Sequence, residues 1–142
     1  MKKMKKLLLL SISSFFLVNC NNTAVVNIKD SLKSNPMAQQ WSDKTADFGG
    51  VPQFDKMNPE LVKEAMLSGM EISLMDIDKI ANNLDSPTFE NTIEEMERSG
   101  KLLDDVYSYY GILSSNMSSP EFRTIQGDLA PKLSEYSSKI SQ

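Results

Sequence analysis

The chain has 142 residues, with one Cys, no His and a formal net charge of -4 at neutral pH. Without His, these residues can build no Ser-His-Asp triad, no imidazole general base and no His-ligated zinc site. A single Cys excludes an internal disulfide and a CxxC motif. The acidic balance, with no Lys and Arg cluster beyond the first six residues, argues against a nucleic-acid partner. The length allows one domain at most.

Residues 1–19 have the pattern of a signal peptide. Four Lys fall within the first six residues, and an apolar run follows from Leu7 to Val18. These correspond to the basic and apolar regions of a secretory signal. The apolar run is about 12 residues long, whereas a helix needs about 20 to cross the hydrocarbon core of a membrane. We therefore expect a cleaved signal peptide rather than a permanent transmembrane helix.

The chain's Cys directly follows this apolar run. Leu17-Val18-Asn19-Cys20 resembles the lipobox of bacterial lipoproteins, in which the Cys is acylated and becomes the new N-terminus. The resemblance implies that Cys20 is a lipid attachment point, which would hold the protein on the lipid bilayer of a bacterial cell envelope. The alternative is an ordinary secretory signal with an incidental Cys, which would leave a secreted or periplasmic protein.

Two segments without a sustained helical period come next. Residues 20–34 are rich in Asn, Ser and Thr, which predicts a flexible tether. Residues 35–57 combine large apolar side chains with Pro and Gly, which predicts an ordered but irregular segment lying along an apolar surface. Its large apolar side chains are Trp41, Phe48, Val51 and Phe54.

The rest of the chain reads as helix. Three runs place a capping residue beside a Pro, as helix N-termini do: Asn58-Pro59-Glu60, Ser86-Pro87-Thr88 and Ser119-Pro120-Glu121. Apolar residues then recur at three- and four-residue spacings, which predicts helices over residues 59–83, 87–116 and 120–140. No strand-like alternation of useful length occurs, so the predicted fold class is all-α.

The spacings also predict which residues face the core. On the first helix, the residues predicted to face the core are Leu61, Val62, Ala65, Met66, Gly69, Met70, Ile72, Ile77, Ile80 and Leu84. The second offers Phe89, Ile93, Met96, Leu103, Val106, Tyr110 and Leu113, and the third Phe122, Ile125, Leu129, Leu133, Tyr136 and Ile140. Gly100 predicts a bend or a close packing contact, and Pro131 predicts a kink. The broad first stripe predicts exposed apolar patches and marginal stability for the isolated chain.

Several motifs occur in order along the chain: Asn35-Pro36, Trp41, Phe48-Gly49-Gly50-Val51-Pro52, Phe54-Asp55, Pro59-Glu60, Ser86-Pro87-Thr88-Phe89-Glu90-Asn91-Thr92-Ile93, Glu97-Arg98-Ser99-Gly100, Leu102-Leu103 and Ala130-Pro131-Lys132-Leu133. Together they resemble the N-terminal portion of the M3 family of zinc metallopeptidases, in the peptidyl-dipeptidase and oligopeptidase A branch. The likeness covers about residues 35–140.

The resemblance implies an all-helical fold whose N-terminal helices form one wall and part of the roof of a deep channel for short peptides. In the family, zinc is held much further along the chain by the two His of an HExxH helix and by a further Glu. This sequence has no His. The resemblance therefore gives no catalytic or metal-ligating residue here, and we expect the chain alone to bind no zinc and to be inactive.

Two functional hypotheses follow. In the first, residues 35–142 are the truncated N-terminal helical region of a lipid-anchored zinc metallopeptidase that hydrolyses short peptides in the cell envelope. In the second, the chain is a small standalone helical lipoprotein that binds a peptide or protein partner without catalysis. The helical period continues to Gln142 without a stop signal, which fits a chain cut off within a helix and equally a frayed natural terminus. The first hypothesis is favoured instead by apolar stripes that would face neighbours missing from this chain.

Three groups of residues that could suggest a site have simpler interpretations. We expect the acidic cluster to lie on a solvated helix face rather than to bind metal; its members are Glu94, Glu95, Glu97, Asp104 and Asp105. Asp76 and Asp78 should point in different directions on a helix, and no calcium-loop Gly and Glu accompany them. Of the neighbouring Tyr107, Tyr109 and Tyr110, two should serve ordinary helix packing.

Overall fold

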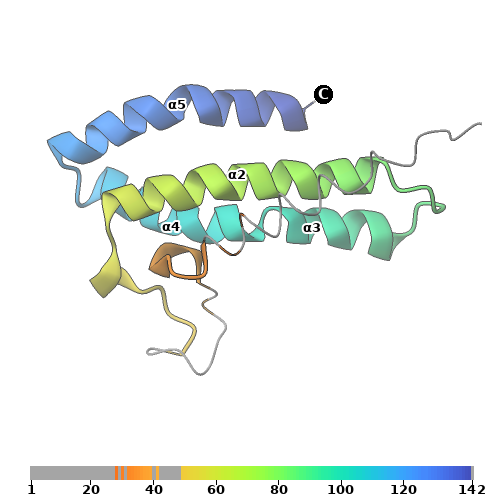
Figure 1. Cartoon of the computed structure of the whole chain (residues 1–142), viewed down its shortest axis with the longest axis horizontal. Helices are drawn as coiled ribbons and strands as arrows, with labels where there is room; N and C mark the ends of the chain where they lie inside the picture. The colour runs from red at the N-terminus through yellow and green to blue at the C-terminus, as the bar shows by residue number, and fades with distance from the viewer. Residues whose placement is uncertain (1–27, 29, 31, 40, 42–48, 142) are drawn as a thin grey trace, which may run out of the picture.

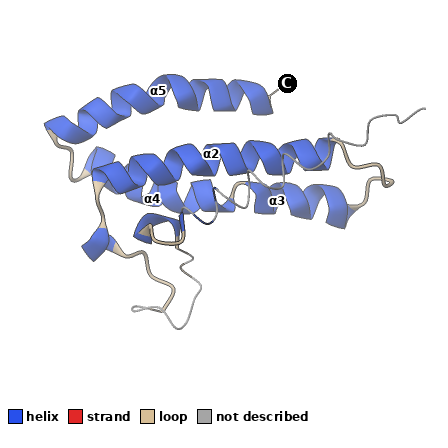
Figure 2. Cartoon of the chain, viewed as in Figure 1, coloured by secondary structure: helices blue, strands red, loops and turns tan. Residues whose placement is uncertain are grey.

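The computed structural model describes residues 28, 30, 32–39, 41 and 49–141. Among these residues every regular element is helical and none is a strand (Figure 2), which confirms the all-α class. The elements are η1 (Pro36–Ala38), η2 (Phe54–Lys56), α2 (Pro59–Ala81), η3 (Phe89–Glu94), α3 (Glu95–Ser99), α4 (Lys101–Ser115) and α5 (Pro120–Ile140). In this described part, no helix is both long and apolar enough to span a membrane. The predicted signal peptide and Cys20 lie outside it.

Side-chain caps set the helix starts. The Asn58 side chain accepts hydrogen bonds from the backbone N–H of Glu60 at 2.9 Å and of Leu61 at 3.2 Å, so α2 begins as predicted. Ser119 caps α5 in the same way. At the second start the cap is Thr88, and Pro87 precedes it. Local sequence is enough to place these starts, because each cap bonds within three residues of itself.

The second predicted helix is divided. It opens with η3, which is a wide π-type turn, continues as α3, and begins again as α4 after Gly100. Gly100 has φ -95° and ψ -7°, away from the ideal helical values. The bend expected at this Gly is confirmed as a boundary between two helices.

The helix α2 is the centre of the fold. In Figure 1, α5 runs along one side of it, and α3 and α4 run along the other. Its buried residues are Val62, Ala65, Met66, Gly69, Met70, Ile72 and Ser73. All of them except Gly69 and Ser73 join Leu103, Val106, Tyr109 and Leu113 of α4 and Phe122, Ile125 and Leu129 of α5 in one apolar cluster. Burying one large apolar side chain of this kind contributes about 1.5–3 kcal/mol, so this cluster dominates the folding energy.

The closest approach of α2 and α4 occurs at Gly69. A Cβ at this position would lie 3.3 Å from the Cα of Leu103. At Gly100, by contrast, an added Cβ would come no nearer than 3.7 Å to the Asp104 side chain. The Gly needed for close packing between helices is therefore Gly69.

The last helix, α5, continues through Pro131 and changes direction along its length in Figure 1. Pro131 has no N–H to give to the carbonyl of Gly127, which accounts for the bend. The contact with α2 includes a 2.9 Å hydrogen bond between the hydroxyls of Ser73 and Tyr136. Beyond this bond, the side chain of Ile140 is exposed.

The irregular segment before α2 is held by polar contacts. The Asn35 side chain accepts from the N–H of Met37 at 2.9 Å and donates to the carbonyl of Leu61 at 3.0 Å. Met37 is fully buried. Ile28 and Leu32, both within the predicted tether, already pack against the core, and the tether's residues are described only in part.

Tyr109 of α4 contacts the later part of this segment, at Trp41, Gln53 and Phe54. Its hydroxyl accepts a 2.8 Å hydrogen bond from the N–H of Gln53. The rings of Trp41 and Phe54 meet its ring edge-on, with centroids 5.9 Å and 5.7 Å away. Burial raises the pKa of Tyr109, against the lowering effect of the Gln53 N–H. Trp41 and the backbone of Gln53 thus lie against the core as predicted, whereas Val51 and Phe54 are exposed and Phe48 lies outside the described residues.

Part of the predicted core assignment is wrong. Phe89, Ile93 and Met96 of the second stripe are 63%, 46% and 52% exposed. Leu84, from the first stripe, lies in the loop after α2 and is fully exposed. The helix α2 itself has no large exposed apolar side chain, because α4 and α5 cover it. Exposed apolar side chains therefore lie on η3 and α3, and singly at positions such as Val51 and Met117, rather than on the first helix.

Replacing Gly69 with Leu is expected to destabilise the fold. The new side chain would clash with the Leu103 backbone, and overpacking of this kind costs about 1–3 kcal/mol. Urea unfolding would show a lower midpoint. The matched control is Gly111→Ala on the exposed side of α4, where an added Cβ meets nothing within 4 Å. Because Ala favours a helix more than Gly does, this control should raise the free energy of unfolding by about 0.5–1 kcal/mol. An unchanged midpoint for Gly69→Leu would contradict the close approach.

Replacing Tyr109 with Phe removes the acceptor of the buried Gln53 N–H and should cost about 1–3 kcal/mol near pH 7. The raised pKa of Tyr109 adds a pH dependence. Wild-type stability is complete below the ordinary Tyr pKa of about 10 and is lost as the pH rises through the higher folded value. Unfolding midpoints measured from pH 7 to 11 should therefore converge for the two chains. A constant difference over this range would refute the role of burial.

Candidate functional site

A polar groove lies between the C-terminal half of α2 and the η3–α3 segment. It encloses about 610 Å³ and is lined by Asp76, Lys79, Ile80, Asn83, Glu90, Asn91, Glu95, Arg98 and Ser99. A second hollow of about 310 Å³ shares Asp76, Arg98 and Ser99 with it and extends to Ala38, Ile72, Lys101, Leu102 and Asp105. The two hollows therefore adjoin at these three shared residues beside α2.

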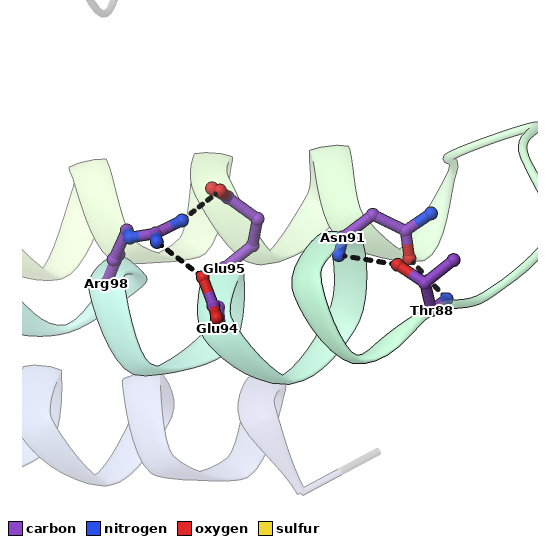
Figure 3. Close-up of polar contacts among 5 residues, drawn as sticks. All are labelled: Thr88, Asn91, Glu94, Glu95 and Arg98. Atoms are coloured by element: carbon purple, nitrogen blue, oxygen red, sulfur yellow. Dashed lines mark hydrogen bonds and ion pairs between the residues drawn. The ribbon is translucent and has the colours of Figure 1, made fainter.

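A capping box positions the η3 wall of this groove (Figure 3). The Thr88 hydroxyl accepts from the N–H of Asn91 at 3.1 Å, and the Asn91 side chain accepts from the N–H of Thr88 at 2.8 Å. Asn91 also donates to the carbonyl of Ser86 at 3.0 Å. Hydrogen bonds from its own N–H and from the Thr88 side chain lower the pKa of Glu90. Glu90 is therefore ionised at neutral pH and can only accept hydrogen bonds there.

Arg98 is fixed at the middle of the groove by two carboxylates (Figure 3). Its Nη1 lies 2.6 Å from Oε1 of Glu95, and its Nη2 lies 2.6 Å from Oε2 of Glu94. These partners raise the pKa of Arg98, with Glu95 having the larger effect. Exposed pairs of this kind contribute little to stability. Their effect here is to hold the guanidinium in one orientation.

The prediction that the whole acidic cluster is solvated is wrong for Asp105. It is only 8% exposed, although the acidic cluster was expected on a solvated face. Lys101, one helical turn earlier, forms an ion pair with it and compensates the buried charge. The Lys101 ammonium also lies 5.8 Å from the centre of the Trp41 ring. The Lys-to-Asp spacing of four residues is the sequence signal that could have identified this pair.

The other acidic residues behave as expected. Glu94, Glu95, Glu97 and Asp104 remain at the surface. Asp76 lines both hollows and pairs with Lys79 at 2.7 Å. Asp78 is exposed and accepts a hydrogen bond from Asn82 instead. The prediction that Asp76 and Asp78 point in different directions is confirmed.

The three neighbouring Tyr side chains also match the expectation. Tyr109 is fully buried, and Tyr110 is partly buried against Phe122, with ring centroids 5.4 Å apart. Tyr107 is 39% exposed. Two of the three therefore serve packing. Tyr109 is a core residue that was not among those predicted from the apolar spacing.

Zinc does not fit the residues that the structure describes. The sequence has no His, and within the described ranges no three acidic or Cys side chains converge in a way that could hold a metal ion. The groove instead offers fixed charges of both signs, together with the amides of Asn83 and Asn91. Such a surface can bind an extended polar chain through hydrogen bonds and ion pairs.

Comparison with known proteins gives one distant similarity. Over 90 residues, the chain is 29% identical to the dipeptidyl carboxypeptidase of Escherichia coli (strain K12). The match covers 63% of this chain but only 13% of that protein. No protein family profile and no solved structure matches the chain. The similarity supports a distant link between this chain and the M3 peptidase family.

Proposed function

We propose that residues 35–142 are the N-terminal helical region of an M3-type zinc metallopeptidase that hydrolyses short peptides in a bacterial cell envelope. The observation that carries this proposal is the 29% identity to a dipeptidyl carboxypeptidase over 90 residues. The all-helical fold is compatible with it. So is the ordered capping box at Thr88 and Asn91, which lies within the longest motif of the resemblance.

In this proposal the chain contributes architecture rather than chemistry. The zinc ligands and the general base would belong to another part of the peptidase, because zinc does not fit the residues present here. The helices α2, α4 and α5 would form a wall of the enzyme. Cys20 would carry the lipid that holds the protein on the membrane.

A second candidate function is a non-catalytic lipoprotein that binds a peptide or protein partner. The groove beside α2 favours it, because fixed charges and side-chain amides line an open space of about 610 Å³. Arg98 would be central to such binding, since it lines both hollows.

A segment exchange tests the first proposal. Residues 35–140 would replace the matching segment of the E. coli dipeptidyl carboxypeptidase, and cleavage of a short quenched peptide would be measured. We expect the exchange protein to keep activity that a chelator removes, whereas a control with an unrelated helical hairpin should be inactive. The chain alone, with zinc added, should cleave nothing.

Two results would contradict this proposal. One is a folded exchange protein no more active than the hairpin control. The other is chelator-sensitive cleavage by the chain alone. Peptide binding by the isolated chain that is lost in Arg98→Ala, combined with an inactive exchange protein, would support the second candidate.

The proposed anchor has a separate test. Cells that make the chain would be fed a labelled fatty acid, and the protein would be isolated and counted. We expect label in the wild-type chain and none in Cys20→Ala, because the thiol is the acylated group. Ser14→Ala, within the apolar run, is the control and should remain labelled. Label persisting in Cys20→Ala would show that the lipid is not attached there.

A further inference from the structure

The two walls of the groove carry polar side chains at matching positions. They are Asp76, Lys79 and Asn83 on α2, and Asn91, Glu95 and Arg98 on the η3–α3 segment. The two walls run in opposite directions along the chain, because the loop 82–88 connects one directly to the other (Figure 1). Steps of three and then four residues forward along α2 are therefore matched by the same steps backward along the opposite wall.

This register sets opposite charges level with each other. Asp76 stands level with Arg98, and the two residues also line the second hollow together, so they are neighbours across the groove. Lys79 stands level with Glu95. Both charged levels lie in regular α-helix, because Glu95 is the first residue of α3 and the wide turn of η3 ends before it. The sequence thus builds a complementary charge pattern across the groove.

The described structure does not use this complementarity. Asp76 pairs with Lys79 of its own helix at 2.7 Å, and Arg98 pairs with Glu94 and Glu95 of its own segment at 2.6 Å. Among the described residues, no ion pair crosses the groove. All these pairs are exposed, so each contributes little to stability. Exchanging them for pairs across the groove therefore costs little.

The wall formed by η3 and α3 is held weakly enough to move. The helix α3 buries only Ser99, η3 buries none of its residues, and every residue of the loop 82–88 is exposed. Gly100 separates α3 from α4 with backbone angles away from the helical values. Beyond it, α4 is anchored in the core by Leu103 and Val106. The segment can therefore swing about Gly100 while α4 stays in place.

We propose that α3 closes on α2 as a lid over the groove, by exchanging ion pairs within each helix for ion pairs between the two helices. In the closed form Arg98 leaves its two carboxylates for Asp76, and Lys79 moves from Asp76 to Glu95. Glu94, which lines neither hollow, is left in water. The described structure is the open form.

The amide level takes no part in this exchange. The Asn83 side chain already accepts from the N–H of Asp85 at 3.0 Å, and Asn91 is held in its capping box with Thr88. The lid therefore depends on four charges, and a ligand in the groove would keep it open by occupying the space between the walls. This inference goes beyond the proposed function and does not depend on it.

The distance between two spin labels measures the closing movement. Asp78→Cys on α2 and Glu97→Cys on α3 would carry the labels, because both positions are exposed and neither lines a hollow. Cys20→Ser in the same full-length chain removes the one native thiol. Pulsed electron paramagnetic resonance should show a longer distance for the open form and a shorter one for the closed form.

Two variants should shift these populations in opposite directions. Arg98→Gln removes the ion pair that closes the lid and should abolish the shorter distance. Glu94→Gln removes a partner that Arg98 has only in the open form and should increase the share of the shorter distance. Arg123→Gln on α5 makes the same chemical change as Arg98→Gln away from the groove, and should leave both populations unchanged.

A charge exchange separates pairing across the groove from pairing within each helix. Asp76→Arg combined with Arg98→Asp places like charges beside each other within both helices, but restores opposite charges across the groove. We expect the combined variant to recover the shorter distance that Arg98→Gln abolishes.

Three results would overturn the lid. One is a single distance in the labelled parent that Glu94→Gln leaves unchanged. Another is a shorter distance that persists in Arg98→Gln, since closure would then not depend on this ion pair. The third is a combined variant that shows the longer distance only.

Discussion

The contact at Gly69 sets how closely α2 and α4, the two helices with the most extensive contact in the fold, approach each other. The Leu103 backbone lies where a Cβ would otherwise be, so the two helices meet closely at this point. Around it, Val62, Ala65 and Met66 are fully buried. Toward the C-terminal end of α2, Asp76 and Lys79 line the space between α2 and α3. Both side chains are charged and remain partly exposed to water. The helices do not close there, and the polar groove is the result.

The same packing determines how the irregular segment before α2 is held. Once α4 is fixed against α2, Tyr109 presents its ring to Trp41 and Phe54 and its hydroxyl to Gln53. Asn35 ties the start of the segment to the first turn of α2. Loops without a period can thus be ordered when their backbone groups find buried partners.

Local signals in the sequence predicted the helix starts, because caps such as Asn58 and Ser119 bond within three residues of themselves. Periodicity identified side chains that share a face, but it could not say whether another element covers that face. Phe89 and Ile93 therefore seemed as buried as Leu103. The groove itself was not predictable, because it depends on the spacing between α2 and α3, which the sequence pattern does not give. Burial of Asp105 depended similarly on a Lys partner and on tertiary packing.

The short segment formed by η3 and α3 carries the second wall of the groove. Arg98 and Asn91 line the groove, while Ile93 of the same segment is 46% exposed. The helix α3 is only 5 residues long and buries only Ser99, which is too little to fix it firmly by itself. The position of the groove wall therefore depends on the capping box that begins the segment and on the contact of α3 with α2.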